Sequence, residues 1–382
     1  FGLDYEKKQL NRALQGKFRR SLLLIGPSGI GKTSLIYDLY QQKNDYGLTS
    51  EKIWETNASL MIRKLTGDGG WQQNLANVCK EISRENSILF IRSFPDMFET
   101  GQYIGNSTSL AGYLRKYIER GEITVITECT PEEAARIETL SPGYLSLFHT
   151  ITFEDVENKD LQKIIEQKIN LLAERNHKVV TEDAITEIIW LQQRYAPYSG
   201  FPGKTIRFFE SIILNQKQNQ EIIDRELVMK YFCEETGLPP FIIDQSIPMD
   251  IAETEKFFKS NVLGQEIAGE TIVNLLTSVK AALGRKGKPI ASLLFVGPTG
   301  VGKTEMAKVL AQFMFGSPQK MFRFDMSEFS SPDAVLRLTG SSFYSVGVLT
   351  AKIRQEPFSV VLFDELEKAH YSFFDLLLQI LG

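Results

Sequence analysis

The sequence has few cysteines, and it lacks any hydrophobic run long enough to cross a membrane. Its three cysteines, Cys79, Cys129 and Cys233, are odd in number and far apart, so they provide neither a disulfide framework nor a zinc cluster. They predict reduced thiols in the core of a cytoplasmic protein. A membrane-spanning helix needs roughly 18 to 20 apolar residues in a row. No stretch of this sequence reaches that length, so we expect no membrane partner.

The sequence also lacks a strong excess of either charge. Its 43 basic and 47 acidic side chains give a formal net charge of −4. Proteins that bind nucleic acid through its phosphates carry clustered positive charge, so this balance disfavours nucleic acid as a partner. The basic run Gly284–Lys288 is short enough to be a solvated loop.

The length of 382 residues and the hydrophobic content of 43% suit two or three globular domains of about 100 to 200 residues each. The sequence begins at Phe1 instead of a methionine, and it stops at Gly382 directly after an amphipathic stretch. We therefore expect it to be part of a longer chain.

An internal repeat divides the sequence into two similar units. Ser21–Tyr40 reads SLLLIGPSGIGKTSLIYDLY, and Ser292–Ala311 reads SLLFVGPTGVGKTEMAKVLA. Each combines an apolar strand, a glycine-rich turn and a helical pattern. Each is followed by a second apolar run, at Ser87–Phe98 and Ser359–His370. The repeat predicts two α/β units in tandem, each with a parallel sheet flanked by helices.

The residues between the two repeats predict further elements. Buried strands are expected at Ile123–Cys129 and His149–Val156, and the pattern becomes helical from Asp160 to about Tyr231. The prolines of Thr236–Pro248 indicate a linker. These features predict an α/β part at 1–155, a small helical subdomain with the linker at 156–245, and the second unit at 246–382.

Both repeats contain the complete phosphate-binding pattern G-x-x-x-x-G-K-[ST] between a strand and a helix. Glycines let backbone N–H groups surround phosphate oxygens, and the start of the helix adds partial positive charge. Lys32 and Lys303 would reach the β- and γ-phosphates, while the hydroxyls of Thr33 and Thr304 would bind Mg²⁺. The predicted phosphate loops are Gly26, Pro27, Ser28, Gly29, Ile30, Gly31, Lys32 and Thr33 in the first unit, and Gly297, Pro298, Thr299, Gly300, Val301, Gly302, Lys303 and Thr304 in the second.

The second apolar run ends differently in the two units. It ends in Asp364 and Glu365 in the second unit, where the first unit has Arg92 and Ser93. Asp364 at a strand end can hold Mg²⁺ through its water shell, and Glu365 can orient and deprotonate an attacking water. A solvated turn is the alternative. We expect Glu365 and Lys303 to be the catalytic residues.

On these residues the chain resembles the Clp-type AAA+ unfoldases, ATP-driven rings with two ATPase modules. The second unit matches in GPTGVGKTEMAKVLA, FRFDMSEF, VVLFDELEKAH and LLLQILG. NVLGQEIA resembles the segment that packs on adenine, which would place Val262 and Leu263 beside the base. The first unit matches more loosely, in FGLDYEKKQL, the phosphate loop and Gly200–Ser211, which is similar to the family's Pro-Asp-Lys segment.

The resemblance implies tandem P-loop AAA+ modules, ATP and Mg²⁺ as cofactors, and a homo-oligomeric ring of six copies. The ring would remodel or unfold a protein substrate, with an adaptor or a peptidase as a further partner. Pro202–Gly237 is too short for the coiled-coil insert of the disaggregase branch, so the layout is closer to the branch that feeds peptidases. The alternative is a nucleotide-dependent scaffold or switch that binds one protein partner without threading it.

The first module departs from the family pattern where hydrolysis would take place. Arg92 and Ser93 replace the two carboxylates, with Arg92 pointing either at the site or away toward a surface or neighbouring-subunit carboxylate. Ser146 and Leu147 stand where the family presents two arginines to the neighbouring subunit. Such an arginine contributes about 10³- to 10⁵-fold in rate. We expect the first module to bind nucleotide with little or no turnover, the alternative being an empty loop.

The expected substrate-gripping loops also depart from the family. Near Gly67, the expected place of a pore aromatic, the nearest aromatic residue is Trp71, which a packing role explains better. In the second module this loop is short, and either Tyr344 and Val346 are remnants of the grip or part of the loop is missing from the sequence.

Overall fold

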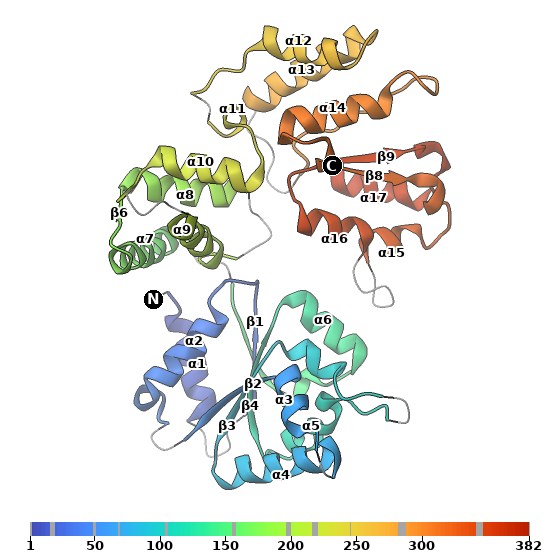
Figure 1. Cartoon of the computed structure of the whole chain (residues 1–382). Coiled ribbons are helices and arrows are strands. Elements are labelled where there is room, and N and C mark those ends of the chain that lie inside the picture. Colours follow the sequence, from blue (N-terminus) through green and yellow to red (C-terminus); the bar gives the residue numbers. More distant parts are fainter. Residues whose placement is uncertain are drawn as a thin grey trace. The chain divides into compact units, whose positions relative to one another are not determined.

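The computed structural model consists of two compact units (Figure 1). The first unit comprises Phe1–Asn176 and Tyr198–Leu214, and the second comprises His177–Pro197 and Asn215–Gly382. The three-part division at residues 155 and 245 stays a prediction. The structure describes residues 2–15, 20–48, 51–67, 69–103, 106–154, 158–195, 200–215, 221–244, 246–281, 288–340 and 347–381.

The first unit contains a five-stranded parallel sheet with the order β2-β3-β4-β1-β5. The strands predicted at Ile123–Cys129 and His149–Val156 form as β4 and β5. Leu22, Leu23 and Leu24 on the central β1 are fully buried, as expected for a parallel strand covered on both faces. The strands are β1 (Leu22–Ile25), β2 (Ile53–Asn57), β3 (Ile88–Arg92), β4 (Thr124–Cys129) and β5 (His149–Thr152).

Helices cover both faces of this sheet. Helices α1 and α2 lie on one side of it, and α3 and α5 on the other (Figure 1). Alternation along β1 directs Leu22 and Leu24 into a core shared with α1 and α2, while Leu23 enters the core shared with α3 to α6. The helices of this unit are α1 (Asp4–Leu14), α2 (Lys32–Gln41), α3 (Ala58–Leu65), α4 (Gly70–Arg84), α5 (Leu110–Glu119), α6 (Pro131–Leu140), α7 (Asn158–Arg175) and α9 (Gly203–Asn215), with short 3₁₀ turns η1 (Lys43–Tyr46), η2 (Phe94–Phe98) and η3 (Leu145–Leu147).

The cysteines lie largely in the cores, as predicted. Cys79 and Cys129 are buried, and burial raises the pKa of each thiol to about 12. Cys233 is half-buried, and all three are free thiols. Within the described residues, no helix combines the length and the hydrophobicity that spanning a bilayer requires.

The second unit begins with helices from the region predicted to be helical. They are α8 (Glu182–Tyr195), α10 (Arg225–Thr236) and the single turn α11 (Pro240–Ile243), which lies inside the predicted linker. A short parallel pair that the sequence did not predict, β6 (Val179–Val180) with β7 (Ile222–Ile223), precedes α8 and α10.

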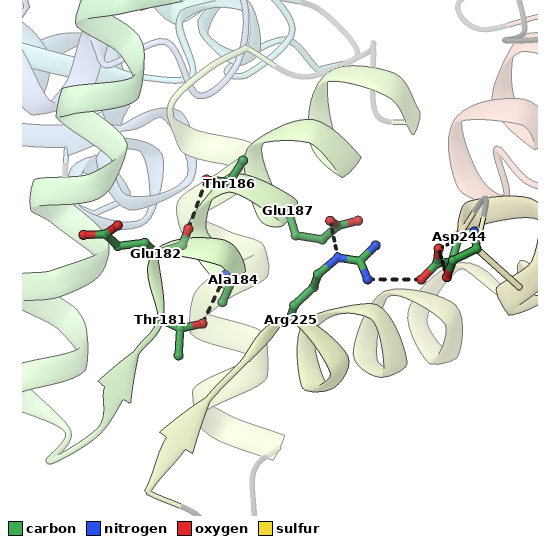
Figure 2. A network of polar contacts seen from close by, with 8 residues as sticks. Thr181, Glu182, Ala184, Thr186, Glu187, Arg225 and Asp244 are labelled. Carbon is green, nitrogen blue, oxygen red and sulfur yellow. Dashed lines mark hydrogen bonds and ion pairs between the residues drawn. The ribbon is translucent and has the colours of Figure 1, made fainter.

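Arg225 ties these helices together (Figure 2). Its Nε donates to Glu187 of α8 at 2.8 Å, and its Nη1 contacts Asp244, directly after α11, at 3.2 Å. Both carboxylate side chains are nearly buried, at 13% and 12% exposed. The hydrogen bond to Glu187, with a further one to Asp244, raises the pKa of Arg225. One planar guanidinium therefore satisfies two carboxylates at once.

The rest of the second unit contains a two-stranded parallel sheet, β8 (Met321–Asp325) with β9 (Val360–Asp364). Phe324 and Phe373 lie in its core. The helices are α12 (Ile251–Asn261), α13 (Glu266–Ala281), α14 (Lys303–Phe315), α15 (Ala334–Thr339), α16 (Val348–Gln355) and α17 (Ser372–Leu381), with 3₁₀ turns η4 (Pro318–Lys320), η5 (Met326–Phe329) and η6 (Leu366–Lys368).

The apolar strand predicted at the start of Ser292–Ala311, in front of the second phosphate loop, does not form. Leu294 and Val296 in this segment are 75% and 87% exposed. In the first unit β1 lies between β4 and β5, which supply its hydrogen-bond partners. After β9 the described residues form only η6 and α17, so the segment has no strand on either side to pair with. The segment has the apolar pattern of a strand, but a strand forms only where its backbone can hydrogen-bond to a neighbouring strand.

Replacement of Arg225 tests the link between the helices. We expect Arg225→Ala to lower the free energy of unfolding by about 1–2 kcal/mol, because two nearly buried carboxylates lose their donor. Arg225→Lys should recover only part of the loss, since an ammonium cannot contact both groups in the same plane. Urea unfolding followed by circular dichroism would measure the change.

Lys230→Ala on the same helix is the matched control. Its contact with Glu234 is 3.9 Å long and both side chains are more than half exposed, so we expect about 0.5 kcal/mol or less. Equal losses for the two alanine variants would contradict the bridging role of Arg225.

Candidate nucleotide-binding sites

The first phosphate loop has a backbone suited to bind an anion. Gly29 and Gly31 have φ angles of +88° and +110°, which side-chain-bearing residues rarely adopt. Gly31 is the N-cap of α2 and provides no side-chain cap, so the first N–H groups of the helix remain available for a ligand. This donor set fits a phosphate group.

Lys32 is buried at the base of this loop. Its Nζ donates to the backbone carbonyls of Gly26, at 2.5 Å, and of Pro27, at 2.9 Å. Burial lowers the pKa of Lys32, and the nearby Glu128 carboxylate opposes that effect. The ammonium is therefore held beside the loop where phosphate oxygens would be bound.

The second phosphate loop repeats this local structure. Gly300 and Gly302 have φ angles of +86° and +92°, and Gly302 is the uncapped N-cap of α14. Lys303 Nζ donates to the carbonyls of Gly297 and Pro298, each at 2.8 Å. The two loops therefore have equivalent conformations and fit the same ligand.

The ends of β3 and β9 also have the same backbone. Ser93 directly follows β3 with φ 52° and ψ 60°, and Glu365 directly follows β9 with φ 54° and ψ 46°. Left-handed conformations are uncommon in residues other than glycine. The structure thus places Ser93 and Glu365 at equivalent positions, as the sequence predicted.

An ion pair at these strand ends has opposite polarity in the two units. In the first unit Arg92 Nη1 on β3 lies 3.2 Å from Glu55 Oε1 on β2. In the second unit Asp364 Oδ2 on β9 lies 2.9 Å from Arg323 Nη2 on β8. The registers are equivalent, because Asn57 pairs with Arg92 and Asp325 with Asp364, so Glu55 and Arg323 occupy the same position.

This ion pair settles the orientation of Arg92. Strand β2 lies on the side of β3 that faces away from β4 and β1, so Glu55 draws the guanidinium away from the phosphate loop. Both side chains are partly exposed, at 46% and 41%. Of the two orientations left open by the sequence, the structure shows the one toward a surface carboxylate.

The strand that leads to the carboxylates of the second unit packs against the helix that follows the second loop. Helix α14, which begins with Lys303 and Thr304, packs against β9, which ends in Asp364. Asp364 Oδ1 accepts the backbone N–H of Glu365 at 3.0 Å. Lys368 Nζ donates to Glu365 at 2.7 Å, and this hydrogen bond raises the pKa of Lys368.

One carboxylate beside the first loop was missed from the sequence. Glu128, on β4, accepts the hydroxyl proton of Thr33, whose Oγ1 lies 2.9 Å from both carboxylate oxygens. The available signal was an acidic residue near the end of a buried strand in an α/β fold.

The two residues expected beside adenine differ in burial. Val262 is 6% exposed, and its Cγ1 lies 3.5 Å from the position that a Cβ on Gly302 would occupy. Leu263 is 85% exposed. In the first unit Leu3 Cδ1 lies 3.3 Å from the position that a Cβ on Gly31 would occupy. The sequence interpretation did not name Leu3.

The positions expected to hold arginine fingers and substrate-gripping residues have different surroundings. Ser146 and Leu147 lie in η3, where the Ser146 hydroxyl donates to the carbonyl of Gly143 at 2.7 Å. Trp71 is 7% exposed and packs edge-to-face on Tyr113, which confirms its packing role. Tyr344 and Val346 lie outside the described residues.

The start of α9 contacts the first phosphate loop. The N–H groups of Gly200 and Gly203 donate to the carbonyls of Ser28 and Gly29, at 2.8 and 2.9 Å. A Cβ on Gly203 would lie 2.5 Å from the Gly29 oxygen and 2.7 Å from its Cα. Position 203 therefore accepts only glycine unless the loop or the helix moves.

Two family profiles match the chain. Residues 22–153 match the family described as "ATPase family associated with various cellular activities (AAA)". Residues 288–382 match the family described as "AAA domain (Cdc48 subfamily)". Each match contains one phosphate loop.

Curated relatives match the whole chain. The ATP-dependent Clp protease ATP-binding subunit ClpE of Lactococcus lactis is 26% identical over 445 residues, covering 100% of this chain and 59% of its own length. Subunit ClpL of Staphylococcus aureus is 25% identical over 447 residues, covering 100% and 64%. The chain therefore spans less than two thirds of either relative.

Solved structures of Hsp104 match the fold. The S. cerevisiae Hsp104–ADP complex has a TM-score of 0.71 at 26% identity, and its casein complex in an extended conformation has 0.71 at 25%. Both matches cover 100% of this chain and 67% of the other.

Gly203→Ala tests the contact between α9 and the loop. We expect a loss of about 1–3 kcal/mol in unfolding free energy, because the methyl group overlaps the Gly29 backbone. Gly112→Ala is the control, since the closest atom to its Cβ position lies at an ordinary 3.4 Å. A loss no greater than that of the control would contradict the close approach.

A charge exchange tests the reversed ion pair. Glu55→Arg should destabilise the protein by bringing two guanidinium groups together, and the double variant Glu55→Arg/Arg92→Asp should recover most of the loss. A double-mutant cycle should give a coupling of about 0.2–1 kcal/mol, since the pair is partly exposed. Strictly additive effects would show that the two side chains are not partners.

Proposed function

We propose that this Clp/Hsp100-type AAA+ chain, which carries two AAA modules, uses ATP to remodel or unfold a protein partner within a homo-oligomeric ring. The observation that carries the proposal is the presence of two equivalent phosphate loops with an Asp-Glu pair beside only one of them. The names of the relatives describe ATP-binding subunits of an ATP-dependent protease, and the Hsp104 structures contain ADP or casein.

The second module would hydrolyse ATP. Lys303 binds the β- and γ-phosphates, and Thr304 and Asp364 hold Mg²⁺. Bound Mg²⁺ neutralises charge that develops on the phosphate oxygens. Glu365 orients the attacking water in line with the γ-phosphate and takes its proton. Val262 lies close enough to Gly302 to pack beside a nucleotide base, and Leu263 is the second predicted contact.

The first module would hold nucleotide through Lys32 and Thr33 without useful turnover. Arg92 is paired with Glu55, and Ser93 is no base. Ser146 presents no cation, since its hydroxyl donates to the carbonyl of Gly143. A ligand that binds only the folded, assembled form stabilises that form by mass action. Nucleotide in this module would therefore support the ring, which we expect to have six copies.

The second candidate is a nucleotide-dependent scaffold or switch that binds one protein partner without threading it. The buried position of Trp71 favours it, because the aromatic residue nearest the expected pore position is unavailable for gripping substrate. The identity of the protein substrate, an adaptor or a peptidase follows from neither candidate.

Substitution of Glu365 tests the assignment of the motor. We expect Glu365→Gln to reduce ATP turnover about 10²-fold or more, because the water loses its base. Glu367→Gln, an exposed neighbour with the same charge change, should keep the wild-type rate. Turnover that survives Glu365→Gln would refute the assignment.

Two further measurements test the role of the first module and distinguish the two candidate functions. Lys32→Ala should weaken ring assembly, while the assembled fraction keeps its turnover. If it abolished hydrolysis and left assembly intact, the passive role of the first module would be wrong. Movement of an unfolded reporter protein during turnover would support the unfoldase, and turnover without movement would favour the switch.

A further inference from the structure

The first module has a carboxylate at the position where a nucleotide-bound cation would lie. Thr33 is the second residue of α2, and the hydroxyl at this place is the loop's own ligand for Mg²⁺. Its Oγ1 is 2.9 Å from both oxygens of Glu128. The carboxylate therefore faces the same point as the predicted metal ligand.

The sheet brings Glu128 to this place. Strand β4 pairs in parallel with β1, with Glu128 opposite Leu24 and Cys129 opposite Ile25. The carboxyl ends of both strands lie at the edge where the phosphate loop begins. Strand β3, which ends in Arg92, is one strand further from β1, or about 4.8 Å more. A glutamate on β4 thus reaches the loop without the help of β3.

The charges favour a cation between Glu128 and a bound nucleotide. A carboxylate beside a triphosphate is repelled by it, and a divalent cation bound to both converts that repulsion into attraction. Glu128 also lies close enough to Lys32 to oppose the effect of burial on that ammonium. The first module therefore has a lysine, a threonine and a carboxylate, as the second module has. The carboxylate comes from β4 in the first module, whereas in the second module it comes from β9, the equivalent of β3.

We propose that Glu128 holds a divalent cation, Mg²⁺ or Mn²⁺, together with nucleotide in the first module, and so replaces the acidic residue that is absent at Arg92. This inference rests on the proposed binding of nucleotide by the first loop. Glu128 supplies a metal-holding group only, and Ser93 still provides no base. The module would retain metal-dependent binding and lack hydrolysis.

The experiment uses the full chain with Lys303→Ala, which disables the second loop. The affinity for a fluorescent ATP analogue is measured in Mg²⁺ and in excess EDTA, with and without Glu128→Gln. We expect Glu128→Gln to reduce the gain in affinity due to Mg²⁺ by about tenfold or more, as for other metal-positioning groups. Binding in EDTA should be equal or tighter, because a negative charge has been removed.

A direct readout of the metal accompanies the affinities. Mn²⁺ with ATP should give an electron paramagnetic resonance signal of the bound ion in the Lys303→Ala chain, and Glu128→Gln should weaken this binding. Glu132→Gln is the matched control, since Glu132 is an exposed carboxylate that also acts on Lys32 from α6. It should leave the gain due to Mg²⁺ unchanged.

The possible failures are distinguishable. If Glu128→Gln tightens binding equally in Mg²⁺ and EDTA, the carboxylate only repels nucleotide and the inference is overturned while nucleotide binding stands. If Glu128→Gln leaves the gain in affinity due to Mg²⁺ unchanged, the inference is likewise overturned. If the Lys303→Ala chain binds no nucleotide under any condition, the proposed role of the first module falls, and the inference falls with it.

Discussion

The parallel pairing of β1 with β4 and β5 determines what the first unit can do. These ladders bury the aliphatic residues that lead into the phosphate loop, and they fix the register that sets Glu128 opposite Leu24. The burial of Lys32 and the contact between Thr33 and Glu128 depend on that edge of the sheet. In the second unit the equivalent segment has no ladder among the described residues, and its side chains are exposed although the loop keeps its conformation. The turn is therefore a local property of its glycines and helix start, and the buried setting of the lysine comes from the sheet.

The two units also show how one backbone accommodates opposite charges. The position after the strand is left-handed in both, and the neighbouring strand provides a partner in both. Exchanging arginine and carboxylate between two adjacent strands preserves the pair and the fold, because the attraction is the same in either direction. The exchange removes an acidic residue from the site without leaving an unpaired charge in its place. Loss of the site carboxylates is thus compatible with a stable sheet.

Much of the site could be predicted from the sequence, because its main parts are contiguous. The phosphate loops are eight-residue patterns whose glycines and lysine act locally, and the equivalence of Ser93 with Glu365 followed from the aligned strands. The packing role of Trp71 was also predicted, and its burial confirms it. The partner of Arg92 and the contact of Glu128 depend on register between strands far apart in sequence, which no local pattern specifies. The strand in front of the second phosphate loop was predicted wrongly for a related reason, because a strand forms only where it can pair with neighbouring strands.

The contact of α9 with the first loop has a mechanical meaning. The carbonyl oxygens of Ser28 and Gly29 accept the N–H groups of Gly200, just before α9, and of Gly203, its first residue, and at Gly203 the two backbones are in close contact. A loop held in this way cannot adjust around a ligand independently, because a shift of its peptide groups must rotate or displace the helix. Loop and helix are therefore coupled, so a displacement of the loop would move the thirteen-residue α9 with it. This close contact is possible because residue 203 has no side-chain methyl group.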